Sequence, residues 1–217
     1  DPLWSRGLGD VYKRQFGKSN LATCEELAAD YKVKVVKTFP LAIAAEDAKP
    51  VVAGLAETKP GAVVMIMAGR QVEVFMRDYR ASAGGAPLYT LSVGITDAAG
   101  SAQRLEGKLA GLVTASIVPP PQAVRVPIVA DYQRDRAEFG EKIDSYTALE
   151  GYIVARVMAE GLRRGGKALT RESFVAGLES IGSTRFGDFP IEYGPRNHNG
   201  SNFVDLEMYT RDGQLRR

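Results

Sequence analysis

The 217-residue sequence contains one cysteine, Cys24, and one histidine, His198. A single cysteine excludes an intrachain disulfide and a metal site made of several cysteines, and a single histidine excludes a site made of several histidines. The sequence also lacks any apolar run near the ~20 residues that a membrane-spanning helix requires. We therefore expect neither a metal ion nor a membrane span in this chain.

Charge of one sign is not in excess, because 28 basic residues stand against 26 acidic ones and the formal net charge is +2. The sequence has no basic stripe with interleaved aromatic side chains, which is the pattern typical of nucleic-acid binding. We therefore expect no nucleic-acid partner. The hydrophobic content of 45% and the charged content of 25% are ordinary for a globular protein with a real core.

Catalytic motifs are also absent. Residues 161–168 (GLRRGGKA) nearly match a phosphate-binding loop, but Ala168 stands where that loop needs a hydroxyl, and the segment follows a helix rather than a strand. His198 lies in a Pro/Asn/Gly-rich stretch typical of a surface turn. No set of residues supplies a nucleophile, a base and an oxyanion donor, so we predict that the protein is not an enzyme and binds no cofactor.

The first fifteen residues, DPLWSRGLGDVYKRQ, differ from the rest of the chain, because they contain the only tryptophan and show no periodicity. The stretch resembles a translated adapter sequence of the kind found at the ends of open reading frames from fragmentary sequence data. We expect residues 1–15 to be non-native and leave them out of the fold prediction. The alternative is a native loop and strand.

From residue 16 onward, helical and strand patterns alternate. Apolar residues recur at helical spacing in residues 21–31, 45–58, 71–83 and, more weakly, from residue 96 or 101. Short β-branched or continuous apolar runs, typical of strands, occupy residues 33–39, 62–67, 88–93 and 112–118. Strands that alternate with long helices imply βαβ units, so we predict an α/β fold with a parallel sheet and helices on both faces.

The pattern changes at three consecutive prolines, residues 119–121, which predict an extended crossover. Three helical patterns follow, over residues 127–139, 145–164 and 170–180. The second is the strongest in the chain, and we expect it to begin at a capping box formed by Thr147 and Glu150, or at Asp144.

Two β-rich runs end the chain, at residues 189–193 and 203–209. Asn199-Gly200 predicts a hairpin turn between them, and Asp212-Gly213 predicts a second turn. An all-helical block between two β-containing blocks suggests that the chain crosses between two lobes and returns.

Several motifs, taken in order, resemble the leucine/isoleucine/valine-binding family of periplasmic binding proteins, the type I fold. The matching segments are residues 16–19 (FGKS), 58–64 (TKPGAVV), 91–94 (LSVG), 145–152 (SYTALEGY) and 197–201 (NHNGS). The resemblance covers residues 16–217. It implies two α/β lobes, with residues 16–118 and 186–217 in the second lobe and residues 119–185 forming crossovers and helices of an incomplete first lobe. The sheet of the first lobe, the opening strand of the second and a signal sequence would then be missing from this chain.

The resemblance also implies a short set of ligand-binding candidates: Phe16, Gly69, Arg70, Thr96 and Asp97. Phe16 stands where the family often has a tyrosine in the cleft, and Gly69 and Arg70 stand where it often has another aromatic residue. Thr96 stands where amino-acid binders place a glutamate against the ligand ammonium. Because that glutamate is absent, although Asp97 is adjacent, the ligand is not restricted to amino acids. Arg70 would favour an anionic ligand such as a carboxylate; the alternative is that Arg70 is a solvated residue at the start of a helix.

The function implied by the resemblance is that of an extracytoplasmic receptor that delivers a small polar molecule to an ABC importer. The ligand would be a branched-chain amino acid or a related amino acid, carboxylic acid or amide, held by closure of the cleft without chemistry. The partners would be this ligand and the permease subunits, and the receptor would be a monomer that is free in the periplasm or lipid-anchored. One alternative is a ligand-sensing regulator with the same fold, and another is a Rossmann-type enzyme.

Overall fold

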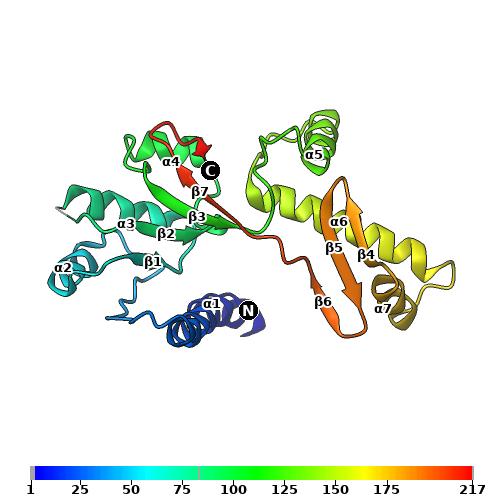
Figure 1. The fold of residues 1–217 in the computed structure, drawn as a ribbon, viewed down its shortest axis with the longest axis horizontal. Coiled ribbons are helices and arrows are strands. Elements are labelled where there is room, and N and C mark those ends of the chain that lie inside the picture. The colour runs from blue at the N-terminus through cyan, green and yellow to red at the C-terminus, as the bar shows by residue number, and fades with distance from the viewer. Residues whose placement is uncertain (1–2, 83, 217) are drawn as a thin grey trace. The chain divides into compact units, whose positions relative to one another are not determined.

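The computed structural model describes residues 3–82 and 84–216, with side chains from Gly17 onward (Figure 1). The chain forms two compact units. Unit 1 contains residues 1–114 and 208–214, and unit 2 contains residues 115–207 and 215–217. Each unit is described by itself.

Unit 1 is an α/β unit whose helices and strands alternate along the chain. The order is α1 (Leu3–Asp30), α2 (Lys49–Thr58), β1 (Val63–Met65), α3 (Arg70–Ala81), β2 (Leu88–Leu91), a 3₁₀ turn η1 (Ser92–Gly94), α4 (Ala98–Arg104) and β3 (Leu112–Ser116). With two later strands, β7 (Asp205–Tyr209) and β8 (Leu215–Arg216), the strands form a sheet of order β1-β2-β3-β7-β8. The division between the units falls within β3 and within β7, and β8 belongs to unit 2. β1 and β2 are parallel, with Val63 opposite Leu88 and Met65 opposite Thr90. The predicted α/β class with a parallel sheet is confirmed.

The core of unit 1 forms where the helical periodicity predicts it. The four side chains that the pattern places on one face of α3 are all buried: Val72, Phe75, Met76 and Tyr79. The rings of Phe75 and Tyr79 stack with their centroids 5.4 Å apart. α3 therefore packs through a continuous apolar stripe, as an amphipathic helix against a core does.

The buried carboxylate of Asp78 on α3 serves the start of α2. The backbone N–H of Ala48, the N-cap residue of α2, donates to Asp78 Oδ2 over 2.6 Å. Arg77 lies 2.7 Å from the other carboxylate oxygen. The Arg77 guanidinium and the Ala48 N–H lower the pKa of Asp78 against the opposing effect of burial. Asp78 thus satisfies an N–H that no residue of α2 itself can bond.

The predicted strand over residues 33–39 is wrong. These residues are extended, but no described strand pairs with them. Val33, Val35 and Val36 are 63%, 43% and 53% exposed. The β-branched residues favour the extended backbone that the sequence predicts, but a strand also needs a neighbour whose N–H and C=O groups complete its ladder.

Unit 2 combines three helices with a small antiparallel sheet. The helices are α5 (Pro127–Glu138), α6 (Tyr146–Gly165) and α7 (Arg171–Glu179). The strands are β4 (Gly182–Phe186), β5 (Phe189–Gly194) and β6 (Asn197–Gly200), in the order β4-β5-β6. Its core is formed mainly by α5, α6 and β5, and includes Val118, Ile128, Val129, Tyr132, Leu149, Ile153, Val157, Ile181, Phe189 and Ile191.

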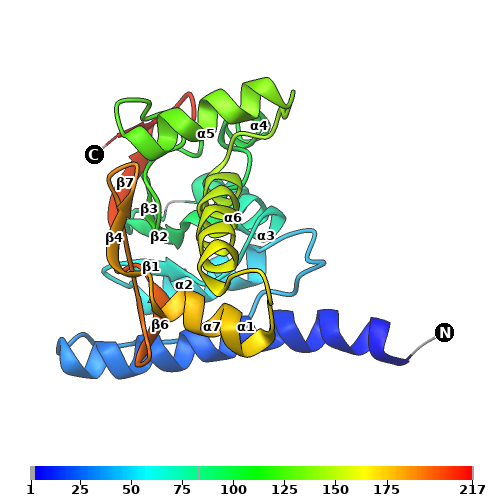
Figure 2. The same ribbon diagram turned by 90° about the vertical axis from the view of Figure 1, so that its right-hand side faces the viewer.

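The long helix α6 carries core residues four apart, Leu149, Ile153 and Val157, and packs against α7 (Figure 2). The contact with α7 continues this row at Gly161 and Gly165. It begins at Ser145, whose hydroxyl accepts the N–H of Ala148 over 3.2 Å. The predicted caps, Asp144 or a box of Thr147 and Glu150, are therefore wrong by one to two residues. Ser145 has the extended backbone that an N-cap needs, whereas Thr147 is already helical.

The predicted hairpin between residues 189–193 and 203–209 is also wrong, because β5 and β7 belong to different sheets. β5 pairs instead with β4 and β6. The turn between β4 and β5 has positive φ at both central residues, 52° at Gly187 and 69° at Asp188, as the tight turns of two-residue hairpins require. The other turn lies at Pro195-Arg196, so Asn199 and Gly200 are in β6 rather than in a turn. The predicted turn at Asp212-Gly213 is confirmed, with Gly213 at φ 79°.

The contacts divide the chain after Thr114, after Glu207 and after Gln214. The resemblance places its lobe boundaries at residues 118–119 and 185–186 instead. The assignment of the two parts to lobes of a larger protein, and the non-native status of residues 1–15, stay predictions.

Candidate functional site

The candidate binding residues of unit 1 follow two neighbouring parallel strands. Gly69 and Arg70 come after β1, and Thr96 and Asp97 come after β2 and η1. Because β1 and β2 are parallel and in register, their carboxyl ends meet at one edge of the sheet. Ligands of open α/β sheets bind outside this edge. The structure thus gives four of the five candidates a common edge.

Gly69 and Arg70 form the start of α3. Gly69 is the N-cap residue with φ 58°, a backbone conformation that side chains disfavour, and nothing lies within 4 Å of the place where its Cβ would be. Its carbonyl accepts the N–H of Val72 over 3.0 Å. Arg70 is exposed, and no described residue forms a hydrogen bond or ion pair with it. Its guanidinium is therefore available to an anion.

Asp97 already has two partners within unit 1. It is the N-cap of α4, where its carboxylate accepts the N–H of Gly100 over 2.9 Å, and it lies 3.3 Å from Arg104. Arg104 also pairs with Glu73 at 2.6 Å, and together with the Ser101 hydroxyl it lowers the pKa of Glu73 against the effect of burial. These contacts give Asp97 a structural role at the start of α4.

The remaining two candidates are Thr96, whose side chain the structure describes, and Phe16, whose side chain it does not. Thr96 is exposed at the end of the loop between η1 and α4. The side chain of Phe16 lies outside the described residues, so its proximity to a ligand stays a prediction.

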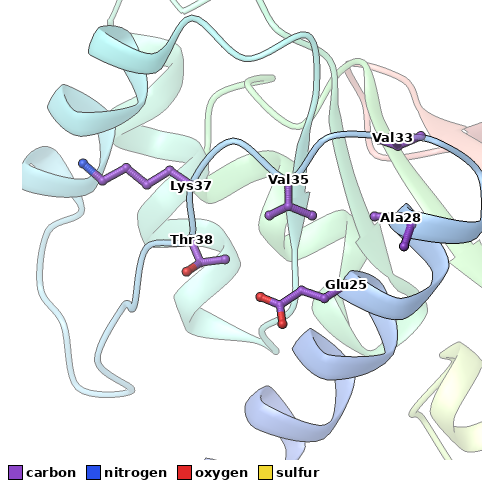
Figure 3. A pocket seen from close by; sticks show the side chains of 7 residues that line it. Glu25, Ala28, Val33, Val35, Lys37 and Thr38 are labelled. Atoms are coloured by element: carbon purple, nitrogen blue, oxygen red, sulfur yellow. The ribbon is translucent and has the colours of Figure 1, made fainter.

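A hollow of about 450 Å³ lies elsewhere, between the end of α1 and the extended segment that follows it (Figure 3). Its lining residues are Glu25, Ala28, Ala29, Val33, Val35, Lys37 and Thr38. These residues all lie between positions 25 and 38 of the chain. Four of their side chains, those of Ala28, Ala29, Val33 and Val35, are apolar. Its polar lining residues, Glu25, Lys37 and Thr38, are all exposed, whereas a small-ligand site buries most of its ligand. The hollow is therefore a weaker candidate than the sheet edge.

The sequence analysis missed a buried polar cluster formed by Ser116, Tyr146 and Glu207. Glu207 on β7 is 3% exposed, and its Oε2 accepts hydrogen bonds from the hydroxyls of Tyr146 on α6 and, at 3.4 Å, Ser116 on β3. The alternation along β7 contained the signal, because Leu206 and Met208 point outward while Glu207 takes the buried phase. A carboxylate in the buried phase of a strand needs hydrogen-bond partners from elsewhere in the fold.

No catalytic constellation is evident among the described side chains. His198 is exposed and lies 3.0 Å from Glu179, with no nucleophile among its hydrogen-bond partners. Within the same residues, no three histidine, cysteine, aspartate or glutamate side chains gather in a way that would hold a metal ion. No helix in the described ranges has the length and apolarity to cross a membrane.

Comparison with known proteins identifies a protein family to which the sequence is similar. A model of the periplasmic binding protein family matches residues 11–210. No curated protein sequence matches significantly.

Solved structures give the same fold. A substrate-binding periplasmic protein from Ralstonia solanacearum superposes with a TM-score of 0.80 at 25% identity, covering 92% of this chain and 57% of its own. A possible leucine/isoleucine/valine-binding protein from Rhodopirellula baltica gives 0.68 at 25% identity, with coverages of 76% and 46%. A fatty acid ABC transporter substrate-binding protein from Thermomonospora curvata gives 0.79 at 18% identity, with coverages of 92% and 53%. The chain thus spans about half the length of these structures.

Proposed function

The chain belongs to the periplasmic binding protein family, and from this premise we propose that it acts as part of an extracytoplasmic solute receptor for an ABC importer. The receptor binds a small polar molecule reversibly and performs no covalent chemistry on it. The match of the family model to residues 11–210 carries this proposal.

Two features of the structure support a binding role. The loops after β1 and β2 lie at the carboxyl edge of a parallel sheet, which is where open α/β sheets bind ligands. The guanidinium of Arg70 at that edge is exposed, and no described residue forms a hydrogen bond or ion pair with it. Closure around a bound molecule excludes water and strengthens each polar contact.

We propose a carboxylate as the ligand class, because of Arg70. Arg70 is an exposed arginine at the candidate edge that lacks a partner among the described residues, and its planar guanidinium suits bidentate binding of a carboxylate. It also begins α3, where the free N–H groups and the helix dipole favour negative charge. Amino acids and fatty acids, which two of the similar solved proteins are named for, both carry a carboxylate.

The test is isothermal titration of the full-length gene product with leucine, valine, a fatty acid and an amide analogue of each. Arg70→Ala is expected to weaken carboxylate binding more than tenfold, a loss above ~1.4 kcal/mol. Arg171→Ala is the matched control, because Arg171 is also an exposed arginine that begins a helix, α7, but belongs to unit 2 and is not one of the candidate residues. Equal affinity of wild type and Arg70→Ala for every carboxylate would show that Arg70 does not bind the ligand.

The partners follow from the same premise. The receptor would work outside the cytoplasm, either free in the periplasm or lipid-anchored, and would deliver its ligand to the permease subunits of the importer. Uptake of the radiolabelled ligand by cells with and without the gene tests this step. Loss of high-affinity uptake on deletion is expected, and unchanged uptake would argue against a transport role.

A further inference from the structure

The cluster of Ser116, Tyr146 and Glu207 lies where the chain passes from one compact unit to the other. The chain first crosses from unit 1 to unit 2 between Thr114 and Ala115, and it crosses back between Glu207 and Met208. We call β3 and β7, which contain these two crossings, the passing strands. Ser116 is the last residue of β3, two positions beyond the first crossing, and Glu207 is the residue just before the second. All three side chains of the cluster belong to unit 2.

The hydrogen bonds of the cluster join three elements that are distant along the chain. Tyr146 and Ser116 both donate to Oε2 of Glu207, across separations of 61 and 91 residues. Tyr146 is the first residue of α6, directly after the N-cap Ser145. One carboxylate oxygen therefore connects both passing strands, β3 and β7, to the start of the longest helix of unit 2.

The buried position makes these bonds obligatory. Glu207 is 3% exposed, Tyr146 is 6% exposed and Ser116 is fully buried. A buried carboxylate that loses a hydroxyl donor keeps its desolvation cost without compensation, so the arrangement strongly disfavours any state that pulls β3 or β7 away from α6. An apolar side chain at position 207 would pack without selecting one arrangement of the three elements.

We infer that Glu207 and Tyr146 are positioning residues that hold the ends of β3 and β7 to the start of α6 within unit 2. This positioning does not rest on the proposed function, because it can be measured without any ligand. Failure of the ligand titration above would leave this inference standing, and failure of the measurement below would leave the proposed function standing.

The test is hydrogen–deuterium exchange of the 217-residue chain carrying Tyr146→Phe, which removes one hydroxyl and keeps the ring. Peptides that cover residues 114–118 and 205–208 are expected to exchange about tenfold faster or more, as the loss of a hydrogen bond to a carboxylate predicts. Peptides from α7 (Arg171–Glu179) in the same unit are expected to exchange as in the wild type. Glu207→Gln should loosen the same two segments, because the amide replaces a strong acceptor.

Tyr132→Phe is the matched control, because the Tyr132 hydroxyl donates to the carbonyl of Ile143 over 3.1 Å within unit 2 and is not part of the Glu207 cluster. It should leave both segments unchanged. If Tyr146→Phe does not fold, Ser116→Ala serves in its place and removes the other donor. The inference is overturned if exchange in the two segments is unchanged, if only one of them accelerates, or if acceleration spreads equally through α7.

Discussion

The packing of α6 against α7 depends on the close approach of Gly177 on α7 to Gly161 and Gly165 on α6. A Cβ added at Gly177 on α7 would lie 2.5 Å from the carbonyl oxygen of Gly161 and 2.8 Å from the backbone nitrogen of Gly165, both on α6. Real Cβ atoms almost never come closer than 3.0 Å. Because both neighbours are backbone atoms, neither can turn aside, and the two helices must separate to admit the methyl group of Gly177→Ala.

The magnitude follows from two opposing effects. Overpacking a tight contact costs about 1–3 kcal/mol. Alanine in a helix interior is favoured over glycine by about 1 kcal/mol. The backbone clash places the cost at the upper end of its range, so we expect Gly177→Ala to lower the free energy of unfolding by about 1–2 kcal/mol.

Gly151→Ala is the control within the same pair of helices. Gly151 lies on α6, is exposed, and has nothing within 4 Å of its added Cβ. Only the helix propensity changes there, so the substitution should stabilise the protein by about 0.5–1 kcal/mol. Urea unfolding followed by far-UV circular dichroism measures both variants. A Gly177→Ala variant as stable as Gly151→Ala would refute the close approach of the helices.

Two further substitutions test the structure of each unit. Asp78→Asn should destabilise unit 1 by about 1–3 kcal/mol at neutral pH. The pKa of Asp78 is lower in the folded protein than in the unfolded chain, so its carboxylate stabilises the fold at pH values above the unfolded-state pKa. This stabilisation is lost as the pH falls through the folded-state pKa. A difference in unfolding free energy between wild type and Asp78→Asn that does not shrink in acid would contradict this. Gly187→Ala should destabilise unit 2, because Gly187 has φ 52° and its Cβ would lie 2.5 Å from the backbone nitrogen of Ile128. Thermal unfolding of Gly187→Ala at the wild-type temperature would show that the turn tolerates a side chain.

Periodicity predicted the helices well because their pattern is local. The apolar stripe of α3 and the long run of α6 are each readable within about twenty residues, and both helices lie within a few residues of their predicted bounds. Strand pairing is not local. Residues 33–39 have the composition of a strand but no neighbour among the described strands, and the partner of β5 is β4, whose sequence GSTRF carries a weak apolar signal.

The candidate site shows the same division. The placement of Arg70 and Thr96 at one edge follows from the order of strands and loops, because parallel neighbours share their carboxyl ends. The structural role of Asp97 at the start of α4 is shown by its hydrogen bond with Gly100 and its ion pair with Arg104. The sequence alone does not distinguish an aspartate that caps a helix from one that contacts a ligand. The Glu207 cluster joins residues 61 and 91 positions apart, so only the three-dimensional structure reveals it.

The central claim is reversible binding of a small carboxylate without chemistry. The most direct measurement is equilibrium titration of the full-length gene product with a panel of amino acids and fatty acids, followed by mass analysis of the recovered ligand. The account predicts saturable binding of one molecule per protein and recovery of that molecule unchanged. Conversion of the ligand into a product, or the absence of binding across the panel, would contradict it.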